Sequence, residues 1–361
     1  MFENCTRERF PFLIAGPCSA ESFEQMETVC RALADIPQVK LIRCGVWKPR
    51  SRPGGFEGAG EEALRWMRRL KTSMPQLRFA VEVAKPSHVE LCLRYEVDAL
   101  WVGARTVGDP FAISDLSDAL RGCVVPMLVK NPQAADLRLW LGAVERLLAI
   151  GLTDLAVVHR GFTSGTGHEL RNDPVWQIPI ELKRTMPNLP LFCDPSHLSG
   201  RRDRIAALSH TALELDFDGL MIECHPNPDH ALTDAEQQIT PHELRRLVET
   251  FGERNAAPAE PNALTVLRER LNLLDAELVR ILAQRLDVVR DVAAVKTQNG
   301  MTIYQPRQWD AKLQHCLQHG RELGLDADFI THIFEAIHME SIRVQQTASR
   351  DEPIADPTST S

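Results

Sequence analysis

The sequence predicts an α/β protein, a (β/α)8 TIM barrel followed by a small all-α domain of three helices. Eight short apolar runs punctuate the first 250 residues, and stretches with helical periodicity, such as 59–70 and 134–150, lie between them. Short buried strands that alternate with helices indicate βα units and a parallel sheet, and eight such units are typical of a closed barrel. The eight runs comprise residues 12–15, 39–42, 79–83, 99–102, 125–129, 155–158, 189–192 and 220–222.

A change of composition marks the end of the predicted barrel. After a helix-like segment at 241–251, residues 252–261 are polar, contain two prolines and lack periodicity, which is typical of a linker. The end of the chain is rich in Ser, Thr, Pro and Asp, a composition that favours disorder. We therefore expect a barrel domain at 1–251, a linker at 252–261, a helical domain at 262–350 and a disordered tail at 351–361.

The segment after the linker carries helical periodicity and no strand signal. A second helix is expected to open with Pro306 in its first turn, and a third begins at about Asp326. Three helices, one of them very long, bury too little apolar surface alone, so we expect this domain to form a homodimer. The apolar stripe of the first helix consists of Leu267, Leu271, Leu274, Leu278, Ile281, Val288, Val292 and Val295.

Composition excludes several classes of protein. A net charge of −8 gives no electrostatic footprint for nucleic acid or an anionic membrane, and no apolar run approaches the 18 residues of a membrane span. Charged residues directly before the first strand leave no room for a signal peptide. Nine cysteines without CxxC spacing indicate reduced thiols rather than a disulfide framework. We expect a cytoplasmic protein.

Residues able to do chemistry follow most of the apolar runs. In a (β/α)8 barrel the active site lies at the carboxyl ends of the strands, here called the rim. Reactive side chains at most of these positions indicate an enzyme. These residues are Cys18, Lys48, Arg105, Lys130, Arg160, His197 and Glu223.

Four rim residues form a mixed set of possible metal ligands: Cys18, His197, Glu223 and Asp234. One thiolate, one imidazole and two carboxylates suit a divalent metal ion, and the two hard ligands fit Mn²⁺, Fe²⁺ or Co²⁺ as well as Zn²⁺. The ligands are distant in sequence. The alternative is therefore that Cys18 is a small buried apolar residue and that His197 caps a helix.

Cationic residues are a second feature of the rim. Arg43, Lys48 and Arg50 lie after the second strand, and Arg105, Lys130 and Arg160 each follow a further strand. Arginine offers a planar fork to phosphate or carboxylate, and lysine a point charge. Residues that are separated in sequence and meet at a barrel mouth predict a substrate with several phosphates or carboxylates, bound beside the metal.

The rim motifs, in their order along residues 10–250, resemble those of the type I 3-deoxy-D-arabino-heptulosonate 7-phosphate (DAHP) synthases of the beta subgroup. The resemblance implies condensation of phosphoenolpyruvate with erythrose 4-phosphate, the first step of the shikimate pathway. It implies that Cys18, His197, Glu223 and Asp234 bind the metal. It also implies a phosphoenolpyruvate site at Arg43, Lys48, Arg105, Lys130 and Arg160, and an erythrose 4-phosphate site at Arg50 and Ser51. The motifs are Ala-Gly-Pro-Cys-Ser-Ala-Glu, Lys-Pro-Arg-Ser, Gly-Ala-Arg, Val-Lys-Asn, Arg-Gly-Phe-Thr, Asp-Pro-Ser-His and Ile-Glu-Cys-His-Pro-Asn-Pro.

Two positions depart from that family. Ser51 stands where Thr is usual, which keeps the hydroxyl, and residues 163–169 leave the usual pattern before Arg171 and Asn172 rejoin it. Lys48 is the expected proton donor to the aldehyde oxygen. The nearest alternative is the sister synthase that makes 3-deoxy-octulosonate 8-phosphate from arabinose 5-phosphate. In that family a Lys-Ala-Asn type motif replaces Lys-Pro-Arg, so Pro49 and Arg50 argue against this alternative.

Polar residues interrupt the apolar faces of the predicted helices. Arg285 occupies an inner position of the long helix, and Lys296 follows three turns later near the same face. In the last helix Ser341 and Gln345 share a face with Ile330 and Ile337. Charged groups on an apolar seam cost free energy unless they are paired, so they predict a buried anion site. The alternative is a polar network that sets helix register.

Residues 262–348 resemble the all-helical chorismate mutases, as in Leu-Arg-Glu-Arg-Leu-Asn-Leu-Leu-Asp and Glu-Ser-Ile-Arg-Val-Gln-Gln. The resemblance implies rearrangement of chorismate to prephenate without a cofactor, with Arg268 reaching into the pocket of the dimer partner. It implies that Lys296 and Gln345 stabilise the breaking ether oxygen. Gln308 departs from the usual Glu, and the loop before it is one residue shorter. The chorismate site would comprise Arg268, Arg285, Lys296, Arg307, Gln308, Ser341 and Gln345.

These resemblances predict a bifunctional enzyme that uses phosphoenolpyruvate, erythrose 4-phosphate and chorismate. The alternative is a synthase whose helical domain only senses a ligand and dimerises. Gln308 and the short loop favour the alternative, whereas the retained cations favour catalysis. Because the helical domain would bind pathway products, we also expect prephenate or chorismate to inhibit the condensation.

Overall fold

The structure, a computed structural model, describes residues 1–2, 5, 10–48, 54–163, 170–252 and 262–351. The chain divides into two compact units, Met1–Ala256 and Ala257–Ser361. Among the described residues, no helix combines the length and the apolar character needed to cross a membrane.

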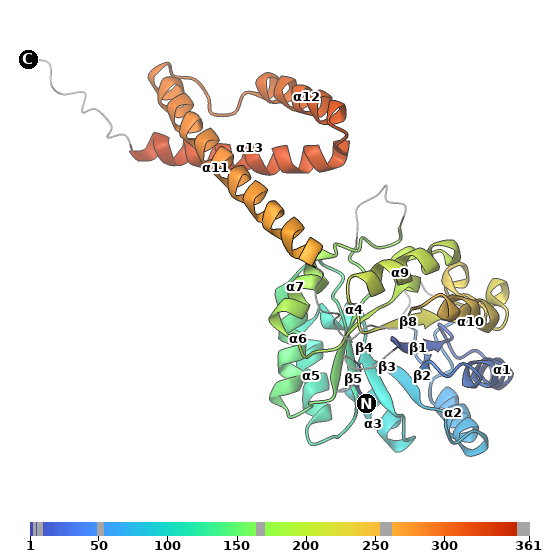
Figure 1. The fold of residues 1–361 in the computed structure, drawn as a ribbon. Coiled ribbons are helices and arrows are strands. Elements are labelled where there is room, and N and C mark those ends of the chain that lie inside the picture. Colours follow the sequence, from blue (N-terminus) through green and yellow to red (C-terminus); the bar gives the residue numbers. More distant parts are fainter. Residues whose placement is uncertain (3–4, 6–9, 49–53, 164–169, 253–261, 352–361) are drawn as a thin grey trace, which may run out of the picture. The chain divides into compact units, whose positions relative to one another are not determined.

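The first unit is a closed barrel of eight parallel strands in the order β1 to β8, as the sequence predicts (Figure 1). The predicted runs 125–129 and 189–192 start two residues before the strands that the structure shows there. Pro126 and Pro190 have no amide hydrogen to donate to a ladder, so β5 and β7 begin directly after them. The strands are β1 (Phe12–Gly16), β2 (Val39–Cys44), β3 (Phe79–Val83), β4 (Ala99–Val102), β5 (Met127–Lys130), β6 (Leu155–His159), β7 (Leu191–Cys193) and β8 (Gly219–Glu223).

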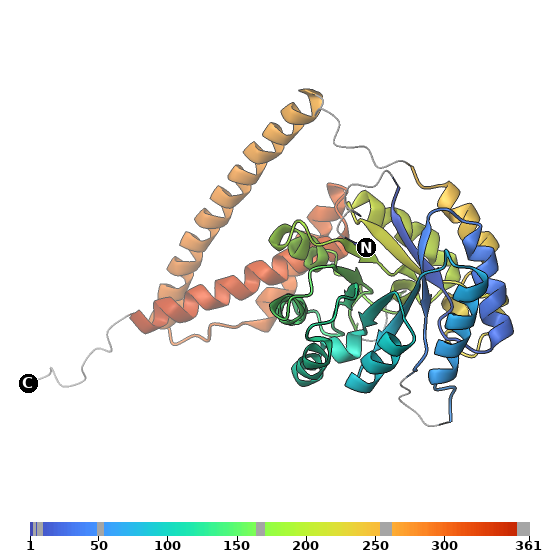
Figure 2. The same cartoon turned by 90° about the horizontal axis from the view of Figure 1, so that it is seen from below.

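Helices surround the strands on all sides (Figure 2). Several begin at side chains that accept a hydrogen bond from the first turn, for example Ser22, Asp109 and Asp136. The helices of this unit are α1 (Phe23–Ala34), α2 (Glu61–Ser73), α3 (Pro86–Arg94), α4 (Ala104–Val107), α5 (Pro110–Leu120), α6 (Leu137–Ala149), α7 (Gln177–Thr185), α8 (Pro195–Ser199), α9 (Ile205–Glu214) and α10 (Pro241–Glu249).

Two apolar layers hold the barrel together. The larger layer lies between the strands and the helices, and the smaller fills the barrel interior with side chains such as Ile14, Trp101 and Met221. At the end opposite the rim, Phe2 packs edge-on against Phe12 and Phe192 with ring centroids 5.7 and 5.8 Å away. Because side chains fill the interior and this end, polar chemistry is confined to the rim.

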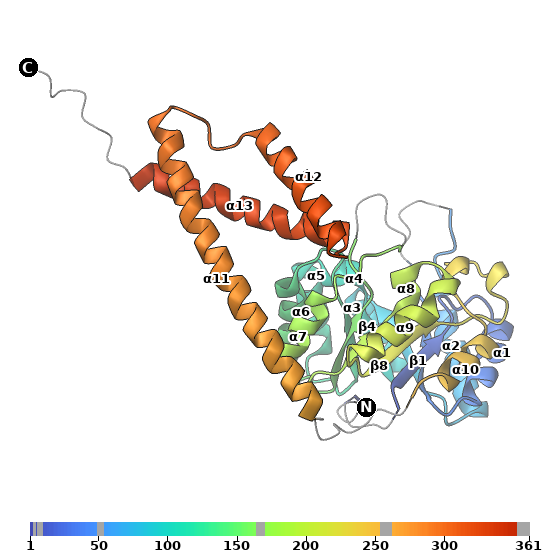
Figure 3. The same cartoon turned by 45° about the horizontal axis from the view of Figure 1, so that its top comes forward.

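The second unit consists, in its described part, of α11 (Asn262–Gln298), α12 (Pro306–Glu322) and α13 (Ala327–Asp351), which confirms the predicted helical domain (Figure 3). Both α11 and α12 contact α13. Ile330 packs so closely on Gly320 that a Cβ there would lie 2.9 Å from the isoleucine side chain. The stripe residues of α11 are 41–60% exposed in the single chain.

Candidate active sites

The ends of the strands place the predicted residues at the rim of the barrel. Glu223 is the last residue of β8, Lys130 the last of β5, and Arg43 the last but one of β2. His197 lies on α8, whose N-cap residue Asp194 comes directly after β7. Cys18 follows β1 by two residues. Side chains from distant segments therefore converge at one end of the barrel.

Three of the four predicted metal ligands form one group. The thiol sulfur of Cys18 and one carboxylate oxygen each of Glu223 and Asp234 all lie within 4.8 Å of one another. Cys18 Sγ is 3.3 Å from Asp234 Oδ2. His197 Nε2 lies 3.9 Å from Glu223 Oε1, so it borders the group but is not within 4.8 Å of every member. We call Cys18, Glu223, Asp234 and His197 the metal group.

The metal group fits a divalent cation. Glu223 Oε1 is buried and lies 2.8 Å from Arg43 Nη2, but it accepts no well-aligned hydrogen bond from the described residues, so it can still serve as a metal ligand. Burial lowers the pKa of His197 and so favours the neutral imidazole that metals bind. Burial and, next, Glu223 raise the pKa of the Cys18 thiol to about 12, against the opposing effect of Lys48. A cation would reverse that balance, because it stabilises the thiolate.

Lys48 lies beside the metal group. Its Nζ donates to Cys18 Sγ at 3.1 Å, and its backbone N–H donates to Glu57 at 2.7 Å. Gly45 makes this approach possible, because a Cβ there would lie 2.1 Å from the carbonyl oxygen of Cys18 and 2.6 Å from Cε of Lys48. Lys48 is thus within reach of a substrate that binds at the metal group.

Asp194 connects the cations to the metal group. Its Oδ2 lies 2.7 Å from Lys130 Nζ, 3.8 Å from Arg43 Nη1 and 2.8 Å from His197 Nδ1. Burial alone would raise the pKa of Asp194, but His197 and Lys130 hold it well below its usual value. Arg43 also reaches Glu223 Oε1 at 2.8 Å. The structure therefore joins both predicted sets through a fully buried carboxylate.

The remaining predicted cations of the barrel differ in their surroundings. Arg160 donates to Asn172 Oδ1 at 2.8 Å, and burial lowers its pKa to about 10. Arg105 lies on α4 and is exposed. Arg50 and Ser51, the predicted erythrose 4-phosphate site, lie outside the described residues, as do residues 164–169 of the predicted variable loop.

A hollow of about 530 Å³ opens beside the metal group. Three polar residues near the metal group were not singled out from the sequence: Arg171 and Gln237, which line this hollow, and Asp194, which contacts His197. Asp194 lies in the Asp-Pro-Ser-His motif directly after a strand, the signal that identified the other rim residues. Gln237 had no comparable signal. The hollow is lined by Leu170, Arg171, Ser199, Gly200, Arg201, Asp234, Ala235, Glu236 and Gln237.

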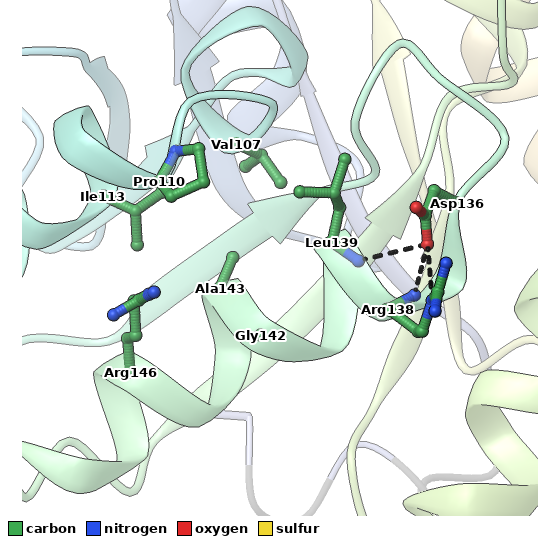
Figure 4. A pocket seen from close by; sticks show the side chains of 9 residues that line it. All are labelled: Val107, Pro110, Ile113, Asp136, Arg138, Leu139, Gly142, Ala143 and Arg146. Carbon is green, nitrogen blue, oxygen red and sulfur yellow. Dashed lines mark hydrogen bonds and ion pairs between the residues drawn. The ribbon is translucent and has the colours of Figure 1, made fainter.

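A second hollow of about 250 Å³ lies on the outside of the barrel, between α6 on one side and the end of α4 with the first turn of α5 on the other (Figure 4). Apolar side chains, among them Ile113 and Leu139, line it, and Arg138 and Arg146 stand at its edge. It contains no member of the metal group and none of the predicted substrate-binding residues. The rim, not this hollow, carries the chemistry of the barrel.

The helical unit brings some of the predicted chorismate residues together. Arg285 Nη1 donates to Ser341 Oγ at 2.7 Å, and Gln345 Nε2 donates to the carbonyl oxygen of Ser341 at 3.2 Å. Lys296 donates to the carbonyl oxygen of Ile303. Arg268, Arg307 and Gln308 are exposed in the single chain.

Sequence reasoning missed two titratable residues next to Arg285. Burial and then Arg285 lower the pKa of Lys312 on α12. Burial and then Lys312, Arg285 and Lys296 lower the pKa of His338 on α13. The His338 ring stacks on Trp309 with centroids 4.0 Å apart. Cations from α11 and α12 therefore lie near one imidazole of α13, an arrangement suited to a polyanionic ligand.

Comparisons with known proteins agree with this geometry. Residues 7–257 match the model of the DAHP synthetase I family, and residues 267–346 match that of chorismate mutase type II. A phospho-2-dehydro-3-deoxyheptonate aldolase of Thermotoga maritima is 28% identical over 237 residues, which are 66% of this chain and 68% of that protein. A crystal structure of a T. maritima DAHP synthase superposes with a TM-score of 0.60 at 27% identity, covering 67% of this chain and 68% of that one.

Other relatives resemble one unit each. The 2-dehydro-3-deoxyphosphooctonate aldolase of Nitratidesulfovibrio vulgaris is 26% identical over 242 residues, or 62% of this chain and 84% of that protein. The T-protein of Haemophilus influenzae is 37% identical over 79 residues, or 22% of this chain and 21% of that protein. The barrel match spans more than half of the chain. The chain therefore belongs to the DAHP synthetase I family, carries a chorismate mutase type II domain after its barrel, and is an enzyme.

Proposed function

We propose that the barrel condenses phosphoenolpyruvate with erythrose 4-phosphate and water to give DAHP and phosphate. The observation that carries this proposal is the convergence, at one rim, of the metal group with Lys48, Arg43, Lys130 and Arg160. Phosphate-binding cations next to an electrophilic centre are what the union of two phosphorylated substrates requires.

The residues divide the work. A divalent metal held by Cys18, His197, Glu223 and Asp234 supplies a Lewis acid at the aldehyde oxygen when bound; Mn²⁺, Fe²⁺, Co²⁺ and Zn²⁺ all suit this donor set. Lys48 donates a proton to that oxygen as carbon–carbon bond formation places negative charge on it. The clamp cations hold phosphoenolpyruvate so that the reacting carbons meet. The cations that hold phosphoenolpyruvate are Arg43, Lys48, Arg105, Lys130 and Arg160. Arg50 and Ser51 bind erythrose 4-phosphate.

A second aldose is a competing substrate for the barrel. The relatives named 2-dehydro-3-deoxyphosphooctonate aldolases favour arabinose 5-phosphate, whereas Arg50 in the Lys-Pro-Arg motif favours erythrose 4-phosphate. Parallel assays with the two aldoses at equal concentration separate these functions. Faster turnover of arabinose 5-phosphate would assign the barrel to the other reaction.

Cys18→Ser tests the metal-dependent part of the proposal. The change replaces the soft ligand of the metal group, so metal binding weakens and condensation is nearly abolished, while mutase activity is retained. The matched control is Cys123→Ser, at a half-buried thiol far from the rim, which leaves both activities in place. Full condensation by the parent protein in metal-free buffer with excess chelator would contradict the proposal.

For the helical unit, we propose rearrangement of chorismate to prephenate. The supporting observation is the group of Arg285, Ser341, Lys296 and Gln345, which suits the two carboxylates and the ether oxygen of chorismate. Lys296 and Gln345 act on the ether oxygen, and Arg268, Arg285, Arg307, Gln308 and Ser341 hold the substrate. Cations that fix the reactive conformer and oppose developing charge accelerate a unimolecular rearrangement without a nucleophile.

Arg285→Leu separates catalysis from a purely structural role of the cation. Loss of a charge-assisted contact in the transition state costs about 2–4 kcal/mol, or roughly 30- to 1000-fold in mutase rate. Arg343→Leu, which removes an exposed arginine paired with Glu340, is the matched control and keeps the parent rate. A mutase rate near the parent value in Arg285→Leu, with raised stability, would assign Arg285 to helix register instead.

We further propose that the helical unit forms a homodimer through α11. The support is the exposed stripe of this 37-residue helix, in which eight apolar side chains at steps of three, four and seven remain 41–60% exposed. An apolar face of this length is stable in water when a second helix covers it.

A further inference from the structure

The two carboxylates of the metal group share one pattern of hydrogen bonds. Asp234 Oδ1 accepts from Arg171 Nη1 at 3.2 Å, while Asp234 Oδ2 faces Cys18 Sγ at 3.3 Å. Glu223 Oε2 accepts from Gln237 Nε2 at 2.6 Å, while Glu223 Oε1 faces His197 Nε2 at 3.9 Å. In each carboxylate one oxygen accepts a hydrogen bond from a residue outside the metal group, and the other faces a member of the group. Glu223 Oε1 also lies 2.8 Å from Arg43 Nη2.

One nitrogen of Arg171, Nη1, takes part in holding both carboxylates. Arg171 Nη1 also donates to Gln237 Oε1. This bond fixes the orientation of the buried Gln237 amide, because an amide whose oxygen faces Arg171 must present its NH₂ to Glu223. Arg171 therefore reaches Asp234 directly and Glu223 through Gln237.

The backbone around Arg171 is built to hold this side chain in place. Gly200, at φ +66°, lies against it, and a Cβ on Gly200 would be 2.6 Å from Cβ of Arg171 and 3.0 Å from its Cδ. The Arg171 N–H donates to the carbonyl oxygen of Ser199 at 3.2 Å. The next residue, Asn172, donates through Nδ2 to the carbonyl oxygen of His197 at 2.7 Å. The segment that carries Arg171 is thus pinned to the helix that carries His197.

The backbone of Asp234 also indicates that its contact with Arg171 is part of the architecture of the site. Its backbone is left-handed, with φ +47°, a conformation that an L-residue other than glycine adopts rarely. Such a conformation persists when neighbouring contacts hold it, and the Arg171 bond is a contact of this kind.

We propose that Arg171 is a positioning residue for the metal group, which sets one oxygen of Asp234 and one oxygen of Glu223 toward the cation. This inference rests on the proposed metal-dependent function of the barrel. It assigns a role to a residue that belongs to none of the ligand or substrate sets above. Without Arg171, Asp234 loses its paired cation. The Gln237 amide that donates to Glu223 Oε2 loses its fixed orientation, while Arg43 stays paired with Glu223 Oε1. The metal then binds more weakly and in altered geometry.

The test measures Co²⁺ binding to the full-length protein, with Arg171→Gln as the main variant. Residues that hydrogen-bond to metal ligands contribute about 10- to 100-fold to affinity, so the dissociation constant for Co²⁺ should rise by that factor. The absorption bands of the Co²⁺ protein, which report thiolate coordination by Cys18 and the ligand geometry, should shift as well. Arg171→Lys keeps the charge without the fork and should recover part of the affinity.

Two further variants keep the test sharp. Gln237→Met breaks only the path to Glu223, so it should weaken Co²⁺ binding less than Arg171→Gln. Arg184→Gln removes an arginine that pairs with Glu181 on the exposed face of α7, and it should bind Co²⁺ like the parent. A Co²⁺ affinity and spectrum of Arg171→Gln equal to those of the parent would overturn the inference. So would an equal loss of affinity in Arg184→Gln, because the effect would then be general.

The same titration distinguishes this inference from the proposed function. If the parent protein binds no Co²⁺, the metal group itself is wrong and both proposals fail. If the parent binds Co²⁺ tightly and Arg171→Gln binds it equally well, only the positioning role fails. Thermal unfolding of each variant shows whether a lost affinity comes from a lost fold.

Discussion

At the scale of the residue, charge balance around Asp194 organises the barrel site. Its buried carboxylate is the shared partner of Lys130, Arg43 and His197. Cations buried at an active site need a counter-charge before substrate arrives, and phosphoenolpyruvate supplies further negative charge when it binds. A carboxylate that holds the cations in place thus prepares a site for an anionic substrate.

Removing this counter-charge should be costly. In Asp194→Asn, Lys130 and Arg43 lose a buried anionic partner, and breaking a buried pair in this way costs about 3–5 kcal/mol of stability. Chemical denaturation should therefore show a lower free energy of unfolding, and condensation should fall with it. The control, Asp118→Asn, breaks an exposed pair with Arg121 and should change neither property. Parent-like stability of Asp194→Asn would show that these ion pairs contribute little to the free energy of unfolding.

At the scale of the element, α11 has an apolar face that no other part of the described single chain covers. Its stripe from Leu267 to Val295 keeps the spacing of a packed face, yet each of the eight stripe side chains is at least 41% exposed. Arg285 lies on the same helix and reaches Ser341 of α13. One helix would therefore serve both the proposed dimer interface and the proposed chorismate site.

A charge on this stripe should uncouple the proposed dimer. Leu274→Lys combined with Leu278→Lys places two like charges on the face that a second copy would cover, so sedimentation should report monomers and the mutase rate should fall. Condensation by the barrel is the internal reference. Asn272→Lys adds a charge to the same helix away from the stripe and should leave the assembly intact. An unchanged assembly in the double variant would place the interface elsewhere.

At the scale of the whole molecule, two catalytic units on one chain permit regulation. We propose that prephenate or chorismate, bound near Arg268, Arg285 and Lys296, inhibits condensation at the barrel. The physical requirement is that the ligand favours one arrangement of the two units over another. A linker at 252–261 is a suitable hinge in composition; its residues 253–261 lie outside the described part of the chain.

Titration of prephenate into the condensation assay tests this regulation. A typical coupling free energy of about 1–3 kcal/mol corresponds to roughly a 5- to 150-fold change in affinity for the barrel substrates. Arg285→Leu should respond only at higher prephenate concentrations, because its binding site is damaged, and a chain that ends near residue 251 should not respond at all. Unchanged condensation by the full-length protein at saturating prephenate would exclude the regulation.

The sequence by itself determined the order and type of the elements and the residue types at the rim. Eight apolar runs between helical stretches identified the barrel, and the pattern worked because strands buried on both faces must be apolar throughout. Rim residues such as Cys18, Lys130 and Glu223 could be predicted because they lie at or just after the ends of apolar runs, and this adjacency along the chain fixes their place in the fold. The observed starts of β5 and β7 differ from the predicted ones because Pro126 and Pro190 lack an amide hydrogen.

Only the tertiary structure decided which of these residues meet. Asp194 and Lys130 are 64 residues apart, and Arg171 and Asp234 are 63 apart, so their contacts depend on how the closed barrel brings its loops together. Gln237 and Lys312 could not be found for the same reason: each lies in a segment whose neighbours are distant in sequence. Periodicity and adjacency report which way a side chain faces along its own element. The partner on another element follows from packing, which a linear pattern does not contain.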